Sequence, residues 1–332
     1  MLGVVMGLLK AEIEAQSQID CGLVQGMVIA CNKYPELIVL GNQRLNPCPS
    51  AMSANSRFDI ASVGKVMTIA CLARLIDAGL VEIDAPFTTY IPEHALGDSC
   101  NISVRDLAMH CSGFDNSRPY AGMKGEQFER ELLLKMPLRP RLECFEYSCY
   151  NFILLGKIIN RISKMDLEQY ARKYVWTPLK MQQATWYAPG FGPNEVEHWN
   201  PNRPAGEHND TTCFDVGIPL GNGSCFCNIY DMIAFVEDIL RENVFSKQYY
   251  RLIKTCAYEK NAARRSFGWD MCDEKRPVGL SKNTIFHSGY TGQTIYIDPD
   301  NDFWAVVLSS RIGDWGEALM RRKKVAELLF AQ

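Results

Sequence analysis

The chain lacks an excess of charge of either sign, and this excludes the simplest binding partners. Its 332 residues include 35 lysines and arginines against 38 aspartates and glutamates, a formal net charge of −3. Nucleic acids and anionic membrane surfaces attract basic proteins, so we expect neither as a partner. The sequence also lacks a hydrophobic run of about 20 residues, the length of a membrane span.

We expect no targeting signal in this chain. The apolar opening, residues 1–9, is short, has no basic segment before it and has no small-residue cleavage site after it. We therefore expect a soluble protein of the cytoplasm. The oligomeric state stays open.

The sequence also contains no complete pattern for binding a metal ion or a phosphate group. Among thirteen cysteines, Cys225 and Cys227 form a lone C-x-C pattern without the second pair that a zinc site needs. An odd number of cysteines cannot all pair, and most lie among apolar residues, which favours free thiols in a reducing compartment. Gly64-Lys65 is not a phosphate loop, because Asp59 stands at the position of the first glycine and Val66 follows the lysine. We expect no metal and no organic cofactor.

Strand-like segments lie toward the two ends of the chain, and helical segments lie between them. Runs of β-branched and aromatic residues predict strands, whereas apolar residues three and four apart predict helices. The predicted strands are 24–31, 37–40, 266–271, 284–288, 293–297 and 303–309, and the predicted helices are 4–18, 62–78, 104–110, 125–135, 151–162, 167–174, 229–240 and 315–330. We expect an α/β (α+β) fold with one antiparallel sheet, flanked by helices and built from both chain ends. Residues 1–85 and 262–332 are assigned to this sheet region, and residues 86–261 to an inserted, mainly helical region.

The tetrapeptide Ser62-Val63-Gly64-Lys65 lies where a long helix is predicted to start. A serine and a lysine three residues apart face the same side of a helix, so the amine is placed to accept the hydroxyl proton. Taken alone, the pattern is better explained by a serine N-cap beside an exposed lysine, since about one S-x-x-K is expected by chance in a chain of this length. The rest of the sequence must decide between the two.

Two downstream segments carry similar chemistry. Tyr147-Ser148-Cys149 precedes a predicted helix, where a tyrosine can act as a general acid or base if a cation lowers its pKa; a stacked tyrosine at a helix entry is the alternative. His287-Ser288-Gly289 ends a predicted strand, where small residues admit a ligand and a backbone N–H can face an oxyanion. The alternative for His287 is a strand-end histidine with satisfied hydrogen bonds. His110-Cys111-Ser112-Gly113 is interpreted as a structural helix end.

In this order, the three segments resemble the serine β-lactamase and penicillin-binding-protein superfamily. The narrower resemblance is to the group of class C β-lactamases, D-stereospecific peptidases and related carboxylesterases. Further segments resemble that group in the same order, namely 58–62, 81–86, 90–92, 102–107, 110–113, 178–181 and 221–231. The resemblance covers nearly the whole chain and implies a β-lactamase/transpeptidase-like fold, in which the two regions form one catalytic unit.

The resemblance also implies a role for each motif residue. Ser62 would attack a carbonyl carbon and form an acyl-enzyme, while Lys65 and Tyr147 move the proton. The backbone N–H groups of Ser62 and Tyr290 would form the oxyanion hole. Substrate contacts are implied for His287, Ser288, Gly289 and Cys149. The substrate would be a small ester, peptide or β-lactam.

Two positions depart from the family pattern. Cys149 stands where asparagine is common, and a thiol forms weaker hydrogen bonds than an amide; Asn151 comes two residues too late to replace it. His287 stands where many relatives have lysine, and a histidine holds a carboxylate as a cation only when protonated. We therefore predict a serine hydrolase acting on an ester, amide or β-lactam carbonyl, with an esterase or D-peptidase favoured over an efficient β-lactamase. The alternatives are a catalytically silent penicillin-binding or sensor relative, and an acyltransferase.

Substrate choice is assigned to two long loops, residues 116–124 and 188–217. Aromatic side chains in and near the second loop either line an approach to the site or anchor the loop, and the sequence favours neither interpretation. These side chains are Trp186, Tyr187, Phe191, Trp199 and Phe214.

Overall fold

A six-stranded antiparallel sheet forms one half of the molecule in the computed structural model, which describes residues 2–187, 195–198, 200 and 202–331. The strand order is β3-β2-β1-β10-β9-β8. The strands are β1 Val24–Cys31, β2 Tyr34–Arg44, β3 Ser50–Ala51, β8 Ile285–Ser288, β9 Gln293–Asp298 and β10 Phe303–Arg311. Strand β1 pairs with β10, Met27 opposite Ser309, so the two ends of the chain meet in the middle of the sheet. This confirms the predicted antiparallel sheet built from both ends.

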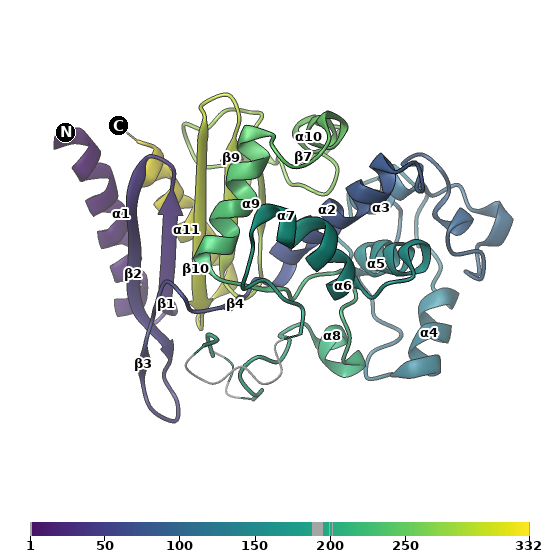
Figure 1. The fold of residues 1–332 in the computed structure, drawn as a ribbon, viewed down its shortest axis with the longest axis horizontal. Coiled ribbons are helices and arrows are strands. Elements are labelled where there is room, and N and C mark those ends of the chain that lie inside the picture. The colour runs from purple at the N-terminus through teal and green to yellow at the C-terminus, as the bar shows by residue number, and fades with distance from the viewer. Residues whose placement is uncertain (1, 188–194, 199, 201, 332) are drawn as a thin grey trace.

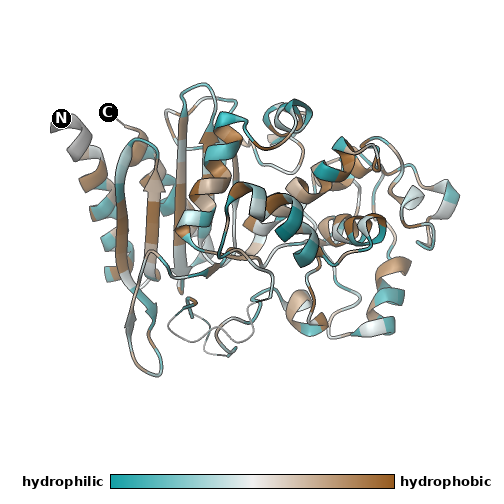
Figure 2. Ribbon diagram, in the orientation of Figure 1, coloured by the Kyte–Doolittle hydropathy of each residue, from teal (hydrophilic) through white to brown (hydrophobic). Residues whose placement is uncertain are grey.

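Both faces of the sheet are covered, which explains why β1 and β10 are buried along their whole length. Helices α1 (Leu2–Asp20) and α11 (Trp315–Phe330) cover one face, and α9 (Ile229–Arg241) covers the other (Figure 1). Strand β10 alternates between two cores: Ala305 and Val307 belong to the core under α1 and α11, whereas Val306 and Leu308 belong to the core under α9. Figure 2 shows the matching hydrophobic colour along the central strands.

The remaining helices form the other half of the molecule, on the right of Figure 1. Helix α2 runs through its centre, is buried over most of its length and packs against α5. The helices are α2 Gly64–Asp77, α3 Val104–Ala108, α4 Gly125–Leu134, α5 Cys149–Ser163, α6 Leu167–Ala171, α7 Thr177–Leu179, α8 Thr211–Val216 and α10 Lys247–Lys254. None of the helices within the described residues combines the length and the apolar character needed to cross a membrane.

Four predicted elements differ from the structure in type or by more than two residues at one end. Residues 266–271 are not a strand, because Gly268 has φ +87° and the chain turns there, with the Ser266 N–H bonded to the Trp269 carbonyl at 3.2 Å. The strand predicted at 37–40 extends over the whole of β2. The helix predicted at 167–174 ends as α6 and continues as a π-helical segment, Arg172–Trp176. The long helix predicted from Ser62 starts with a 3₁₀ turn, Ala61–Val63, before α2.

Candidate active site

Ser62 lies on the 3₁₀ turn between the short strand β4 (Phe58–Asp59) and helix α2. The buried carboxylate of Asp59 accepts a hydrogen bond from the Ala61 N–H at 2.8 Å, and the Asp59 carbonyl accepts one from Thr291 Oγ1 at 2.8 Å. Ala61 has φ +44°, a left-handed conformation that costs about 1 kcal/mol for a residue with a Cβ. These contacts hold a tight turn that leaves Ser62 half-buried at the start of α2.

The Ser62 hydroxyl accepts hydrogen bonds from two side chains. Tyr147 donates its phenolic O–H to Ser62 Oγ at 2.7 Å, and Lys65 donates from Nζ at 3.1 Å. Both distances are within hydrogen-bond range. The three residues predicted to be catalytic therefore lie together, although Tyr147 is distant from the other two in sequence.

Lys65 is fully buried and is held by three further groups. Its ammonium donates to the carbonyl of Asn222, lies 3.5 Å from Cys149 Sγ, and lies 4.9 Å from the centre of the Tyr147 ring. Burial lowers the pKa of Lys65, but the neighbouring Cys149 and Tyr147 outweigh it, so the pKa stands above that of an ordinary lysine. Lys65 is therefore protonated at neutral pH in the unliganded protein.

Tyr147 is positioned by a histidine that the sequence had suggested was only structural. The ring of His110 lies 4.6 Å from the Tyr147 ring, and His110 Nδ1 accepts the Ser148 N–H at 3.2 Å. Burial raises the pKa of the Tyr147 phenol, while the Lys65 ammonium acts in the opposite direction. The phenol keeps its proton at neutral pH, which agrees with its role as donor to Ser62.

Cys149 and Asn151, both at the start of helix α5, point to different partners. Cys149 stays beside Lys65, whereas Asn151 is fully buried and accepts a hydrogen bond from Ser112 Oγ at 2.7 Å. Asn151 therefore does not take the place of the asparagine that relatives have at the position of Cys149.

The end of strand β8 faces the 3₁₀ turn that carries Ser62. The backbone N–H groups of Ser62 and Tyr290 have no hydrogen-bond acceptor within the part of the chain that the structure describes, and both residues line the same cavity. Two free N–H groups beside a nucleophile are what an oxyanion hole requires. The geometry is compatible with the predicted pair and supports it as a proposal.

Gly289 permits this close approach, and replacing it by alanine is expected to lower kcat at least tenfold. A Cβ on Gly289 would lie 2.7 Å from the Ile60 carbonyl oxygen and 3.3 Å from Ala61 Cβ, so the turn that carries Ser62 would have to move. A shift of the Ser62 hydroxyl by about 1 Å can lower the reaction rate by about a hundredfold. The measurement is ester hydrolysis by Gly289→Ala beside Gly316→Ala, whose added Cβ meets no atom closer than 3.3 Å. Equal activity in the two variants would contradict the prediction.

His287 does not supply a cation to the site. Its side chain is buried, and burial, followed by the positive charges of Arg265 and Lys65, lowers the pKa of His287 well below the usual range. The imidazole is therefore neutral at physiological pH, and its Nδ1 lies 3.2 Å from the Ser288 carbonyl.

The site opens into a cavity of about 320 Å³. Its lining comprises Ser62, Phe145, Tyr147, Arg265, Asp270, Lys275, His287, Ser288, Tyr290 and Trp315. Sequence patterns gave no reason to select Arg265, Lys275 or Trp315, because tertiary contacts alone bring them to Ser62.

The aromatic residues of the long loop that the structure describes do not line this cavity. Trp186 is fully buried, packs against Trp176 and donates to the Gly223 carbonyl at 3.1 Å, so it anchors the loop. Tyr187 and Phe214 are partly exposed and are also absent from the lining. Phe191 and Trp199 lie outside the described residues.

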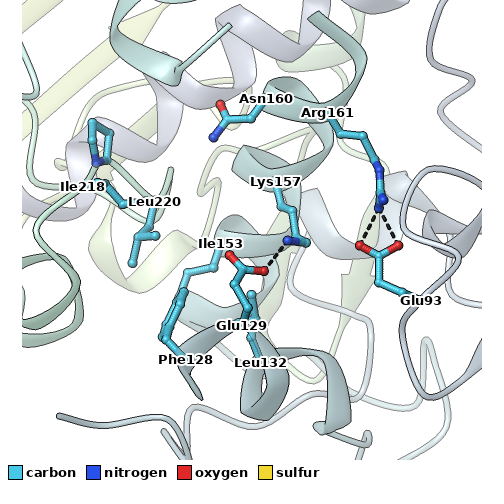
Figure 3. Close-up of a pocket in the computed structure, with 11 residues that line it drawn as sticks. Glu93, Phe128, Glu129, Leu132, Ile153, Lys157, Asn160, Arg161, Ile218 and Leu220 are labelled. Atoms are coloured by element: carbon cyan, nitrogen blue, oxygen red, sulfur yellow. Dashed lines mark hydrogen bonds and ion pairs between the residues drawn. The ribbon is translucent and has the colours of Figure 1, made fainter. Parts of the chain in front are cut away.

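A second cavity, of about 370 Å³, lies among helices α4 and α5 and the segment 218–220 (Figure 3). Its charged side chains pair with each other: Lys157 with Glu129, and Arg161 with Glu93. The lining contains no serine, cysteine or histidine. Among the described residues, this cavity therefore offers neither a hydroxyl nor a thiol nucleophile, and its amine and carboxylates are held in ion pairs.

Known proteins resemble this chain in sequence and in fold. The Beta-lactamase family matches residues 37–330. The chain belongs to this family. A relative described as "Putative D-alanyl-D-alanine carboxypeptidase", from Salmonella gallinarum, is 24% identical over 308 residues, which cover 79% of this chain and 71% of the relative.

Solved structures of the family share the fold. A class C beta-lactamase has a TM-score of 0.81 at 17% identity, with 97% of each chain covered. EstCE1, described as "a hydrolase with promiscuous acyltransferase activity", has a TM-score of 0.80 at 17% identity, with 97% of this chain and 98% of that chain covered. The resemblance deduced from the motifs is thereby confirmed, and the chain is related to serine hydrolases of the β-lactamase fold.

Proposed function

We propose that this family member is a serine acyl-hydrolase that forms an acyl-enzyme on Ser62 and acts on esters or D-peptides in preference to β-lactams. The observation that carries the proposal is the pair of hydrogen bonds to Ser62 Oγ, from Tyr147 at 2.7 Å and from Lys65 at 3.1 Å. A serine hydroxyl needs such neighbours, because it is a weak nucleophile without a group that takes its proton.

The proposed reaction has two halves. Once either Lys65 or Tyr147 has lost a proton, that group accepts the Ser62 proton while Oγ attacks the substrate carbonyl. The Ser62 and Tyr290 N–H groups stabilise the oxyanion, and the collapsing intermediate expels the leaving group, which takes the proton from Tyr147. Water then attacks the acyl carbon, with the same groups moving its proton, and releases the acid and free Ser62. No step requires a metal or an organic cofactor.

We also propose a cytoplasmic location for the protein and a division of the chain into two regions. All thirteen cysteines are free, and most are buried or half-buried, which supports a reducing compartment such as the cytoplasm. We assign residues 1–85 and 262–332 to the sheet region and residues 86–261 to the inserted helical region of one catalytic unit.

The test is intact-mass spectrometry after incubation with a panel of activated esters, D-alanyl peptides and β-lactams. The expected result is a stoichiometric adduct with the mass of the acyl group, mapped to Ser62 by peptide digestion and absent in Ser62→Ala. An adduct elsewhere, or an adduct retained by Ser62→Ala, would overturn the proposal. Turnover without added acceptor identifies hydrolysis, transfer to an added alcohol or amine identifies an acyltransferase, and binding without either identifies a silent relative.

Cys149→Asn is expected to shift activity toward amides. Cys149 lies 3.5 Å from Lys65 Nζ, where an amide side chain would offer two donors and a strong acceptor in place of a thiol. We expect the ratio of kcat/KM for a β-lactam or D-peptide to that for p-nitrophenyl butyrate to rise at least fivefold. Cys256→Asn, a change of the same chemistry at a half-buried cysteine outside the cavity, serves as the control. An unchanged ratio in Cys149→Asn would show that Cys149 does not limit the substrate range.

A further inference from the structure

An apolar stripe runs along the outer side of helix α1, which lies at one end of the molecule (Figure 1). Its members, Met6, Leu9 and Ile13, are 51%, 50% and 61% exposed. They are three and four residues apart, so they lie on one side of the helix. The opposite side, which includes Ala11 and Ala15, is fully buried against the sheet and α11. Half or more of each large apolar side chain of the stripe therefore faces solvent.

Two opposite charges flank the stripe. Lys10 and Glu12 form no hydrogen bond and no ion pair with another residue of the described chain, whereas Glu14 pairs with Arg321 of α11 at 2.8 Å. At 3.6 residues per turn, Lys10 lies on one edge of the stripe and Glu12 on the other. The outer side of α1 thus has an apolar centre, a positive edge and a negative edge.

This pattern is complementary to itself when two copies pack α1 against α1 in parallel. A twofold axis that runs along the two helices places Lys10 of each copy against Glu12 of the other. An antiparallel pair would instead place Lys10 against Lys10 and Glu12 against Glu12. In the parallel pair, the two apolar stripes meet as they do along the seam of a coiled coil. The same surface then serves both copies, as in most twofold dimers.

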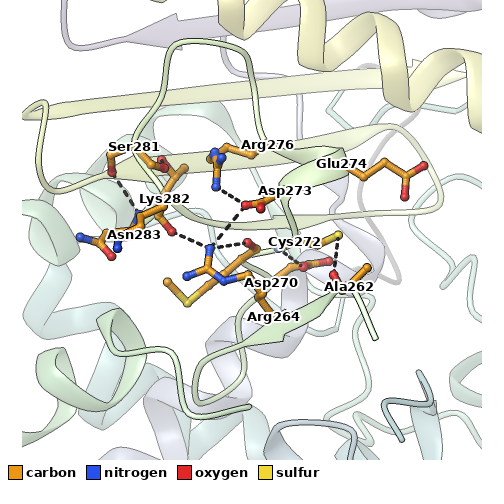
Figure 4. Close-up of polar contacts among 12 residues, drawn as sticks. Ala262, Arg264, Asp270, Cys272, Asp273, Glu274, Arg276, Ser281, Lys282 and Asn283 are labelled. Carbon is orange, nitrogen blue, oxygen red and sulfur yellow. Dashed lines mark hydrogen bonds and ion pairs between the residues drawn. The ribbon is translucent and has the colours of Figure 1, made fainter. Parts of the chain in front are cut away.

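The stripe lies on a rigid support. The ion pair of Arg321 joins α1 to α11, and Lys323 of α11 donates to the Glu274 carbonyl at 2.9 Å. The loop that carries Glu274 is fixed in turn by Arg264, which donates to the Lys282 carbonyl at 3.0 Å (Figure 4). Because this surface is ordered before two copies meet, less entropy is lost when they associate.

A lipid surface fits this side of α1 less well than a second copy does. Helices that lie on membranes carry many lysines and arginines along their polar side. Helix α1 carries one lysine and three acidic residues, and the whole chain has a net charge of −3. Anionic lipids would therefore repel it.

We propose that α1 is a dimerisation helix, which packs in parallel against α1 of a second copy of this chain. Three apolar residues from each copy form a short seam, so the dimer is reversible, with a Kd on the order of 10 µM. The dimer does not depend on the reaction proposed at Ser62.

Sedimentation velocity at about 1 to 300 µM chain spans this Kd and measures the association. The mean mass of the parent should rise with concentration from that of the 37.5 kDa monomer toward that of a dimer. Ile13→Glu places a charge in the seam of each copy and should weaken the association at least tenfold. Leu134→Glu, the same kind of change at a 54% exposed position of α4 in the other half of the molecule, should leave the Kd within twofold of the parent.

Charge reversal tests the parallel arrangement. Lys10→Glu and Glu12→Lys each place like charges across the twofold axis and should each raise the Kd at least threefold. The double variant Lys10→Glu/Glu12→Lys restores opposite charges and should regain the parent Kd within twofold. An equimolar mixture of the two single variants should also associate more tightly than either variant alone.

The start of α4 offers a matched control for the charge reversals. Lys124 and Glu126 have the same spacing as Lys10 and Glu12 and are exposed. Lys124→Glu and Glu126→Lys should leave the Kd unchanged. Circular dichroism and the thermal transition of each α1 variant show whether the helix is kept.

Three results would overturn the proposal. The first is a parent that stays monomeric up to about 300 µM. The second is a dimer that Ile13→Glu leaves intact, because another surface then forms it. The third is a double variant that stays as weak as the single variants, which rejects the parallel arrangement. If the parent stays monomeric and binds phosphatidylglycerol vesicles, and Ile13→Glu does not bind them, the partner of α1 is a lipid surface and the dimer is rejected.

Discussion

Ser62→Ala is expected to lower kcat for an activated ester by at least about 10⁴-fold and to prevent any acyl adduct. The hydroxyl is the atom on which Tyr147 and Lys65 converge, at 2.7 and 3.1 Å, so its removal leaves both groups without a nucleophile to activate. The oxyanion donors belong to the backbone and stay in place, which leaves a small residual rate. The measurement is steady-state hydrolysis of p-nitrophenyl butyrate, with intact mass recorded in parallel.

The control for this prediction is a serine of equal chemistry outside the site. Ser99 is exposed, its hydroxyl donates to the Leu96 carbonyl, and it should tolerate alanine with kcat unchanged. A loss of less than tenfold in Ser62→Ala, with the thermal transition unchanged, would assign the reaction to another nucleophile. Cys149, which shares Lys65 with Ser62, is the first residue to examine in that case.

The sequence predicted the elements whose signals are local. Helix α11 was predicted from its apolar spacing with its observed bounds, Trp315–Phe330. The structure adds the cap at its start, where Asp314 accepts the Glu317 N–H at 2.8 Å. Helix α10 was missed, although Ser246 caps it, because its residues are mostly polar or aromatic and its apolar period is short. The strand predicted at 266–271 is wrong because the chain turns at Gly268. The alternation of residue types along this segment gives no sign of that turn.

The sequence predicted those site residues that belong to recognisable motifs. Ser62, Lys65 and Tyr147 were selected by their order along the chain, and the structure places them in contact. The Asn222 carbonyl that holds Lys65 could not be found in this way, because any residue supplies a carbonyl; only the neighbouring glycines gave a signal. One of them, Gly223, has φ +142°, and a Cβ there would lie 2.5 Å from the Ala61 carbonyl oxygen.

Lys65→Met is expected to lower the rate of acylation by about 10²–10⁴-fold, the usual effect of removing a general base. Methionine is nearly as long as lysine, so the packing against Phe152 and Tyr147 is largely kept while the charge is lost. The measurement is the pre-steady-state burst of p-nitrophenol, which isolates acylation from deacylation. Lys247→Met, on the exposed side of α10, is the control and should show the burst of the parent.

The pH dependence of the burst provides the sharper test of Lys65. Both Lys65 and Tyr147 have pKa values above their ordinary ones and are protonated at pH 7, so the form that can accept the Ser62 proton is a minor species. The parent's acylation rate should therefore rise with pH, by about tenfold per pH unit between pH 7 and 9, where one proton must leave. The Lys65 ammonium lowers the pKa of Tyr147, so its loss in Lys65→Met raises that pKa further and moves the alkaline rise to higher pH. A parent rate that is flat from pH 7 to 9, or a variant whose rise coincides with that of the parent, would show that the Lys65–Tyr147 pair does not accept the proton.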